Sequence, residues 1–197
     1  MLRAEANGLA NITFVFLDRD GVINRKPPAG QYVTCWQEFE LLPGVEEAIA
    51  TLNRSGRKAI VLTNQRGVAL GLYSLEELAG MHERLAEKLA AHGAHLDAIY
   101  ACPHDAGQCN CRKPLTGLFE QAFRDFPAAQ AGNSVMVGDS LRDIEAGRRL
   151  GMRTVLVDDA GAAPASDEVQ LARSLAQLTV ASLAEFVHRH ICPERLP

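Results

Sequence analysis

The sequence predicts an α/β fold: a Rossmann-like parallel sheet with helices on both faces. Two observations support this fold class. Short apolar runs rich in valine and isoleucine alternate along the chain with amphipathic runs. The apolar runs contain few polar residues, as expected of parallel strands that helices cover on both sides. The 197 residues suit a single domain, with a core at about 12–157 and a C-terminal helix at about 182–191.

The strands are expected to be short and buried. The first ends abruptly at two acidic residues, and the others also end at polar or glycine-containing segments. The five expected strands span 12–17, 59–63, 97–101, 134–138 and 154–157.

Helices are expected in the intervals between these strands. Ser74 and Glu77 form a capping-box pattern, which marks a helix start. Pro114 has a backbone angle that suits a first helical turn. The segment 158–167 is rich in alanine, glycine and proline and is expected to be a loop. The expected helices lie at 43–55, at 74–93, after Pro114, at 141–150 and after Ser182.

Composition excludes several classes of function. The formal net charge of -4 argues against nucleic acid as a partner, because phosphate binding needs a basic surface. No apolar run approaches the roughly 18 residues of a membrane span. The first ten residues carry charges where a signal peptide would need an apolar core. We therefore expect a cytoplasmic protein without a membrane partner, and nothing in the sequence requires more than a monomer.

Asp18 and Asp20 are the most informative pair of residues. Alternate residues of an extended segment share a side, so both carboxylates are expected to project together from the end of a buried strand, while Arg19 points the other way. Like charges this close repel, unless a cation or a reaction needs them. Because aspartate and glycine are common at turns, a simple strand-to-turn boundary is the alternative.

Polar segments also follow three other expected strands, namely 63–65, 102–104 and 138–143. In open α/β sheets, ligands bind beyond the carboxyl ends of the strands. Each segment alone could be a turn or a helix cap. Their shared position at one sheet edge predicts a functional site there.

Three cysteines and one histidine form a second constellation: Cys102, His104, Cys109 and Cys111. A Cys₃His set is a usual complement for structural zinc. A thiolate nucleophile is one alternative, but no single cysteine stands out; packing in the core is another. We expect zinc to fix this loop and so to position the residues that follow Cys111.

Four motifs in order make the chain resemble the haloacid dehalogenase-like superfamily of phosphohydrolases. They are the Asp-x-Asp-Gly element at 18–21, Thr63, Lys113, and the Gly-Asp-x-x-x-Asp element at 138–143. The resemblance spans about 12–157.

The resemblance implies an Mg²⁺-dependent phosphatase that works through an aspartyl-phosphate. In that mechanism Asp18 is the nucleophile and Asp20 the general acid and base. Thr63 would hydrogen-bond a phosphoryl oxygen, and Lys113 would balance the negative charges.

The same resemblance implies a magnesium site. Its expected ligands are Asp18, the backbone carbonyl of Asp20, and Asp139, with Asp143 in a supporting place and water in the remaining positions.

Within the superfamily, the zinc loop followed by Arg-Lys-Pro resembles two groups. These are the D-glycero-D-manno-heptose 1,7-bisphosphate phosphatases and the histidinol-phosphate phosphatases. Three stretches favour the heptose enzymes, with removal of the C7 phosphate: 18–24, the segments 32–33 and 39–44 taken together, and 63–73. The expected partner is therefore a small-molecule phosphate ester of carbohydrate metabolism.

The substrate pocket is expected to form from loops, because a large cap domain has no room in this chain. Asn64, Arg66, Arg112 and Lys26 are the expected substrate-binding residues, with Arg112 and either Arg66 or Lys26 on the group distal to the reaction. The segment 25–31 is interpreted as an enlarged substrate loop. A phosphate-binding module without turnover is the alternative of another class.

Overall fold

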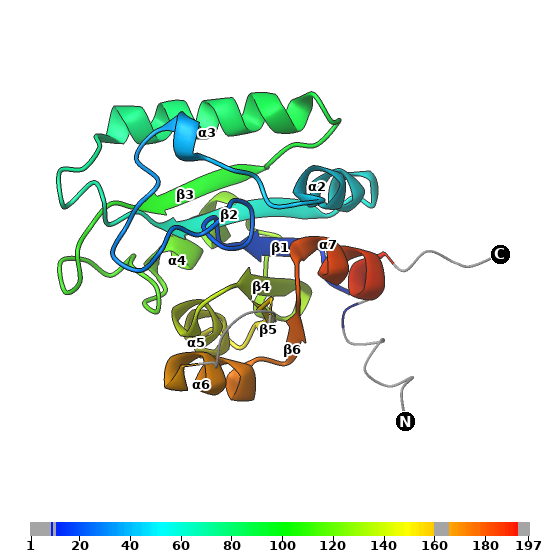
Figure 1. The fold of residues 1–197 in the computed structure, drawn as a ribbon. Helices are drawn as coiled ribbons and strands as arrows, with labels where there is room; N and C mark the ends of the chain where they lie inside the picture. Colours follow the sequence, from blue (N-terminus) through cyan, green and yellow to red (C-terminus); the bar gives the residue numbers. More distant parts are fainter. Residues whose placement is uncertain (1–8, 10, 160–165, 193–197) are drawn as a thin grey trace.

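The computed structural model describes residues 9, 11–159 and 166–192, and it is built on one parallel sheet (Figure 1). The order across the sheet is β3-β2-β1-β4-β5-β6, and every neighbouring pair is parallel. The expected α/β fold is therefore confirmed. The strands are β1 (Phe14–Leu17), β2 (Lys58–Asn64), β3 (Ala98–Cys102), β4 (Ser134–Gly138), β5 (Arg153–Val157) and β6 (Leu178–Val180).

All five expected strands are present, but the sixth was not expected. β6 is only three residues long, and it pairs with β5 at the edge of the sheet. Thr179 at its centre is exposed, and only Val180 is buried. A run of three residues is too short to show the alternation of buried and exposed side chains that marks a strand. Only its backbone pairing with β5 identifies it as a strand.

The helices agree with the expected positions in four places and depart from them in two. Pro114 is not in a first helical turn, because α4 begins three residues later at Gly117. α6 was not expected, and it begins at Asp167, the last residue of the expected loop 158–167, of which 160–165 lie outside the described residues. The helices are α2 (Val45–Arg54), α3 (Leu75–Ala90), α4 (Gly117–Asp125), α5 (Leu141–Arg149), α6 (Asp167–Leu175) and α7 (Leu183–Phe186), with short helical turns η1 (Trp36–Glu38), η2 (Ala131–Asn133) and η3 (Val187–Ile191).

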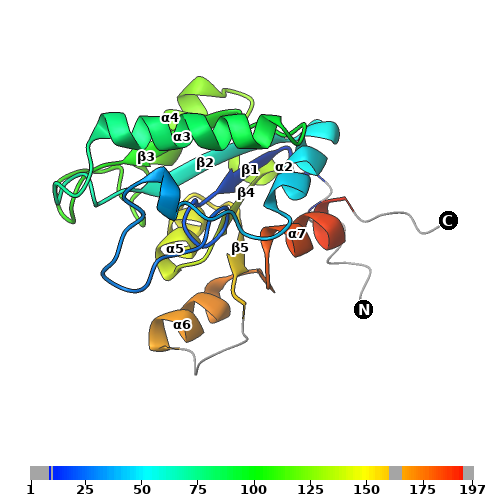
Figure 2. The ribbon, with the colours of Figure 1, turned by 45° about the horizontal axis from the view of Figure 1, so that its top comes forward.

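Helices cover both faces of the sheet, as Figures 1 and 2 show. On one face α2, α3 and α7 pack on β1 residues such as Val15 and Leu17. On the other, α4 and α5 pack against Phe14 and Phe16, and α6 joins α5 beside Leu156. Alternate strand residues are thus buried on opposite sides, which explains why the strands are apolar throughout.

The sheet topology indicates which edge of the sheet can bind a ligand. β1 lies between β2 and β4, so the direction of chain connection reverses at β1 and β4. Asp18 directly follows β1, and Asp139 directly follows β4. Between Asp18 and α2, the chain forms only η1 and isolated bridges, which leaves the site open to the loops around it. Among the described residues, no helix is both long and apolar enough to cross a membrane.

Candidate active site

A cavity of about 570 Å³ lies at the carboxyl edge of the sheet, a size suited to a small-molecule ligand. Asp18 and Asp20 both line this cavity, which confirms the expectation that the two carboxylates lie on the same side. Asp139 and Lys113 line the same cavity from β4 and from the loop after β3. Three of the four polar segments expected at this edge therefore contribute lining residues, whereas 102–104 does not and the loop that follows it does.

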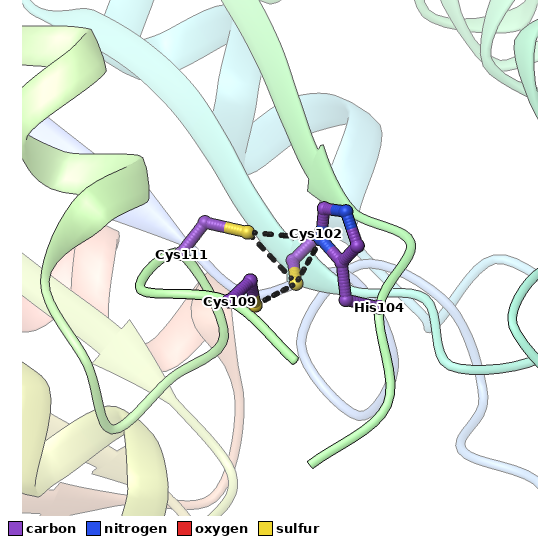
Figure 3. A group of neighbouring side chains, drawn as sticks. All are labelled: Cys102, His104, Cys109 and Cys111. Carbon is purple, nitrogen blue, oxygen red and sulfur yellow. Dashed lines mark hydrogen bonds between the residues drawn. The ribbon is translucent and has the colours of Figure 1, made fainter. Parts of the chain in front are cut away.

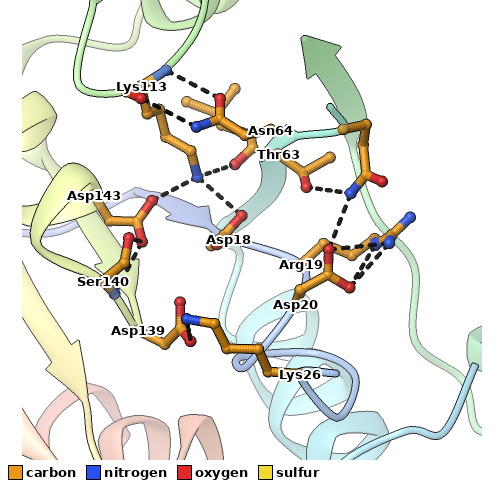
Figure 4. Close-up of polar contacts among 12 residues, drawn as sticks. Asp18, Arg19, Asp20, Lys26, Thr63, Asn64, Lys113, Asp139, Ser140 and Asp143 are labelled. Atoms are coloured by element: carbon orange, nitrogen blue, oxygen red, sulfur yellow. Dashed lines mark hydrogen bonds and ion pairs between the residues drawn. The ribbon is translucent and has the colours of Figure 1, made fainter. Parts of the chain in front are cut away.

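Lys113 is a buried cation at the centre of the cluster (Figure 4). Its side chain is only 1% exposed, and Nζ lies 2.9 Å from Asp18 Oδ1 and 2.6 Å from Asp143 Oδ1. Nζ also donates to the backbone carbonyl of Leu62 at 2.5 Å. A lysine is almost never buried without such partners, so its position is fixed by these three contacts.

The groups around Lys113 are themselves held in place. The side-chain amide of Asn64 accepts from the Lys113 backbone N–H at 3.0 Å and donates to its carbonyl at 3.1 Å. The Asp143 carboxylate accepts from the N–H and hydroxyl of Ser140 at the start of α5. At Gly138, a Cβ would meet the Cβ of Asp143 at 2.2 Å, so only glycine fits between strand and carboxylate.

Burial dominates the electrostatics of the carboxylates. It raises the pKa of Asp18 to about 7, although Lys113 opposes the shift and the neighbouring Asp143 and Asp139 add to it. Burial likewise raises the pKa of Asp139 to about 6, against the opposing charge of Lys26. For Lys113, the attraction of Asp143 and Asp18 outweighs burial and raises the pKa above its ordinary value.

The carboxylates suit a divalent cation. Oxygen atoms of Asp18, Asp139 and Asp143 all lie within 4.8 Å of one another. Two of these buried oxygens, Asp18 Oδ1 and Asp143 Oδ1, contact the Lys113 ammonium and have no further hydrogen-bond donor within the described part of the chain. Hard oxygen ligands are those that Mg²⁺ prefers. Three carboxylates against two ammonium groups, Lys113 and Lys26, leave a net negative charge, which a phosphate dianion would not approach without a further cation.

Asp20 differs from Asp18 in its surroundings, and here the sequence expectation for Arg19 was wrong. The Arg19 guanidinium turns back to Asp20, with Nη2 at 2.9 Å from Oδ1 and 3.1 Å from Oδ2. Strand alternation fixes where a Cβ points, but the long arginine side chain can return to the other side. Its buried guanidinium also lies 5.3 Å from the ring centroid of Phe39.

Three further residues, which no sequence motif indicated, complete the setting of Asp20. Asn24 Nδ2 donates to Asp20 Oδ1 at 2.8 Å, and Gln65 Nε2 donates to Oδ2 at 3.1 Å. The Tyr73 hydroxyl donates to Gln65 Oε1 at 2.6 Å. Gln65 stands next to Asn64 in the Thr-Asn-Gln segment, and that adjacency was the available signal.

Thr63 is almost fully buried at the end of β2. Its hydroxyl accepts a hydrogen bond from Gln65 Nε2 at 2.7 Å, which leaves its own O–H available to donate. It therefore stands beside the Asp20 network.

The four expected zinc ligands form one cluster (Figure 3). Sγ of Cys102 lies 3.5 Å from that of Cys109 and 3.1 Å from that of Cys111, and His104 Nδ1 is 3.4 Å from Cys111 Sγ. Two thiolates on one tetrahedral zinc ion are about 3.8 Å apart, so the group is of the right size. Burial raises the pKa of the Cys102 thiol, so its thiolate form requires a compensating cation.

The expected substrate-binding cations all line the cavity, each with a partner. Lys26 Nζ lies 2.6 Å from Asp139 Oδ2. Arg66 pairs with Asp105, which lies inside the Cys/His loop. Arg112 Nη1 donates to the carbonyl of His104 at 3.5 Å. The expected loop 25–31 also lines the cavity along much of its length.

Paired carboxylates, a buried lysine and an oxygen-rich cation site on a Rossmann-like sheet define the class of phosphoryl-transfer sites. A model of the HAD-hydrolase-like family matches residues 110–186. The D-glycero-alpha-D-manno-heptose-1,7-bisphosphate 7-phosphatase of Mycobacterium bovis is 43% identical over 132 residues, which are 66% of this chain and 69% of the relative. The D-glycero-beta-D-manno-heptose-1,7-bisphosphate 7-phosphatase of Vibrio cholerae is 41% identical over 151 residues, which are 73% and 79% of the two chains.

A solved structure gives the same result for the fold. The D,D-heptose 1,7-bisphosphate phosphatase of B. bronchiseptica, in complex with magnesium and phosphate, superposes with a TM-score of 0.78 at 30% identity. The match covers 90% of this chain and 97% of that chain. The chain therefore belongs to the HAD-like phosphatase family, and it is a phosphoric monoester hydrolase.

Proposed function

We propose that the chain hydrolyses the C7 phosphate of D-glycero-D-manno-heptose 1,7-bisphosphate in the cytoplasm, with magnesium as cofactor. One observation carries the reaction: the buried Lys113 holds one oxygen of the cavity-lining carboxylate of Asp18 at 2.9 Å. The substrate is supported by the relatives of about 40% identity that bear this activity in their names. The cavity volume of about 570 Å³ suits a heptose with two phosphates.

In the first step, Asp18 attacks phosphorus and forms an aspartyl-phosphate as the bond from phosphorus to the sugar oxygen breaks. Asp20 gives its proton to the departing sugar oxygen. Arg19, Asn24 and Gln65 hold the Asp20 carboxylate by both oxygens, so its direction in the cavity is set before substrate arrives.

In the second step, Asp20 takes a proton from water, which attacks the aspartyl-phosphate and releases phosphate. The Lys113 ammonium compensates charge on the phosphoryl oxygens throughout, and the Thr63 hydroxyl donates to one of them. Magnesium, held by Asp18, Asp139 and the backbone carbonyl of Asp20 with Asp143 in support, would neutralise further charge on that group.

The Cys/His cluster is proposed to bind zinc for a structural purpose. Cys102, His104, Cys109 and Cys111 supply four ligands, which close a tetrahedral site and leave no position for substrate. The last ligand is followed at once by Arg112 and Lys113, so zinc would fix the backbone that carries both cations.

Asn64 is proposed to act through Lys113. Its amide oxygen and nitrogen are both engaged by the Lys113 backbone, so it positions that lysine. Arg112, Arg66 and Lys26 remain the proposed contacts for the substrate, because all three line the cavity.

The test is phosphate release from heptose 1,7-bisphosphate, heptose 7-phosphate and histidinol phosphate, with magnesium present and zinc quantified. We expect the bisphosphate to be the best substrate. Asp18→Asn is expected to abolish release on all three while its zinc content stays at the wild-type level. Preference for histidinol phosphate would contradict the proposed substrate, and absence of turnover by the wild type would favour a binding module.

A further inference from the structure

The loop that carries the proposed zinc ligands also contains an acidic residue whose side chain engages the substrate cavity. Asp105 follows His104 directly, and it lines the same cavity as Asp18. Its backbone is fixed within the loop, since its N–H donates to Gln108 Oε1 at 3.1 Å. The carboxylate is therefore presented to the cavity from a constrained segment.

The partner of this carboxylate is Arg66, which reaches it from the loop after β2. Arg66 Nε lies 2.6 Å from Asp105 Oδ1, and Nη2 donates to Oδ2 at 3.0 Å. The two contacts form the parallel pair by which a guanidinium also binds a phosphate. The Nε/Nη2 edge of Arg66, which a phosphate could use, is thus occupied by a carboxylate of the protein.

A second arginine, Arg112, lines the same cavity as Asp105. The hydrogen bond from Arg66 lowers the pKa of Asp105, and the charges of Arg66 and Arg112 act in the same direction. Two guanidinium groups and one carboxylate therefore line this part of the cavity, an arrangement that suits an anion of greater charge.

We propose that Asp105 is a specificity-determining residue, whose carboxylate occupies the guanidinium of Arg66 until the distal phosphate of a bisphosphate displaces it. This inference rests on the proposed function, since the phosphate that reacts must lie at Asp18. A dianionic phosphate competes with the monoanionic carboxylate for Arg66, whereas a neutral distal group does not. Asp105 thereby lowers the affinity for a bisphosphate, which must displace it, and leaves the affinity for a substrate with a neutral distal group unchanged, so it sets the difference between the two affinities.

The experiment measures binding by calorimetry in an Asp18→Asn background, so that bound substrate is not consumed. The probes are heptose 1,7-bisphosphate and heptose 7-phosphate, which differ only in the distal phosphate. Asp105→Asn keeps the side-chain oxygen that accepts the Ala106 N–H at 2.6 Å, but it removes the charge. We expect it to lower Kd for the bisphosphate by about two- to fivefold, since the pair is partly exposed, and to leave Kd for the 7-phosphate within twofold.

Arg66→Gln supplies the second variant. Alone, it should raise Kd for the bisphosphate and not for the 7-phosphate, and combined with Asp105→Asn it should remove the gain in affinity. An unchanged or raised Kd of the bisphosphate in Asp105→Asn overturns the inference, as does an equal shift for both probes. If Asp105→Asn loses zinc, Arg66→Gln still tests the inference. An unchanged ratio of the two Kd values in Arg66→Gln contradicts the role of Arg66.

Turnover of the wild type separates this inference from the proposed function. If the wild type hydrolyses the bisphosphate in preference to the 7-phosphate, and the variants do not change the ratio of Kd values, only the role of Asp105 fails. If the wild type hydrolyses neither, the proposed function fails and the inference fails with it.

Discussion

Replacing Lys113 by glutamine should separate the structural from the catalytic contribution of the buried charge cluster. The ammonium is 1% exposed and lies between carboxylates that are 14% and 1% exposed, those of Asp18 and Asp143. Removing one partner from a buried ion pair leaves an uncompensated charge and costs about 3–5 kcal/mol. We expect the free energy of unfolding of Lys113→Gln to fall by that amount when magnesium is absent, and turnover to fall at least about a hundredfold.

The assay is urea unfolding near neutral pH, followed by circular dichroism, with and without magnesium. Magnesium should restore part of the lost stability, because a divalent cation compensates the same carboxylates. Lys26→Gln is the matched control: it also pairs with an active-site carboxylate, but its side chain is 54% exposed, so its loss should stay below about 1 kcal/mol. Equal losses in the two variants would refute the reasoning, as would a loss below about 1 kcal/mol in Lys113→Gln.

Three further predictions concern other parts of the site. Burial and the charge of Arg19 lower the pKa of His82 to about 4, so between pH 4 and 6.5 the unfolded chain binds more protons than the folded one, and stability falls as the pH drops through that window. In unfolding titrations, His82→Gln should remove up to about 3 kcal/mol of this fall. Identical pH profiles of the two proteins would contradict this expectation. Gly138→Ala should destabilise the protein by about 1–3 kcal/mol in thermal unfolding and reduce turnover, because its Cβ would overlap Asp143. Gly132→Ala is the control: it has open space around it, so neither stability nor turnover should change. Cys111→Ser should lose zinc in metal analysis, and its kcat/KM should fall about ten- to a hundredfold because Arg112 and Lys113 are misplaced. Full activity of this variant without zinc would contradict a structural role of the zinc ion.

Much of the fold could be predicted because its signals are local. Buried parallel strands are recognisable as apolar runs, and the Ser74–Glu77 capping box marks the start of α3, where the structure has it. β6 could not be predicted in the same way. Its three residues carry no periodicity, and they form a strand through backbone pairing with β5, which a local sequence does not encode.

In the candidate site, too, some features could be predicted from the sequence and others could not. Asp18, Lys113 and Asp139 were predictable because each follows an expected strand or motif, and parallel strands bring their carboxyl ends together. The contacts of Arg19 were not, because a long side chain can turn back toward its neighbour. The pairing of Arg66 with Asp105 joins two loops far apart in sequence, and only the three-dimensional arrangement reveals it.

Asp18 is proposed to be the nucleophile and to carry the phosphoryl group during turnover. The most direct measurement is mass spectrometry of protein quenched in acid during steady-state hydrolysis of heptose 1,7-bisphosphate, in wild type and in Asp20→Asn. Asp20→Asn slows both formation and breakdown of the intermediate but keeps the nucleophile, so any phosphoryl group found, in either protein, should lie on the peptide containing Asp18, at that residue. A phosphoryl group on another residue, or turnover of the bisphosphate by Asp18→Asn, would contradict the account.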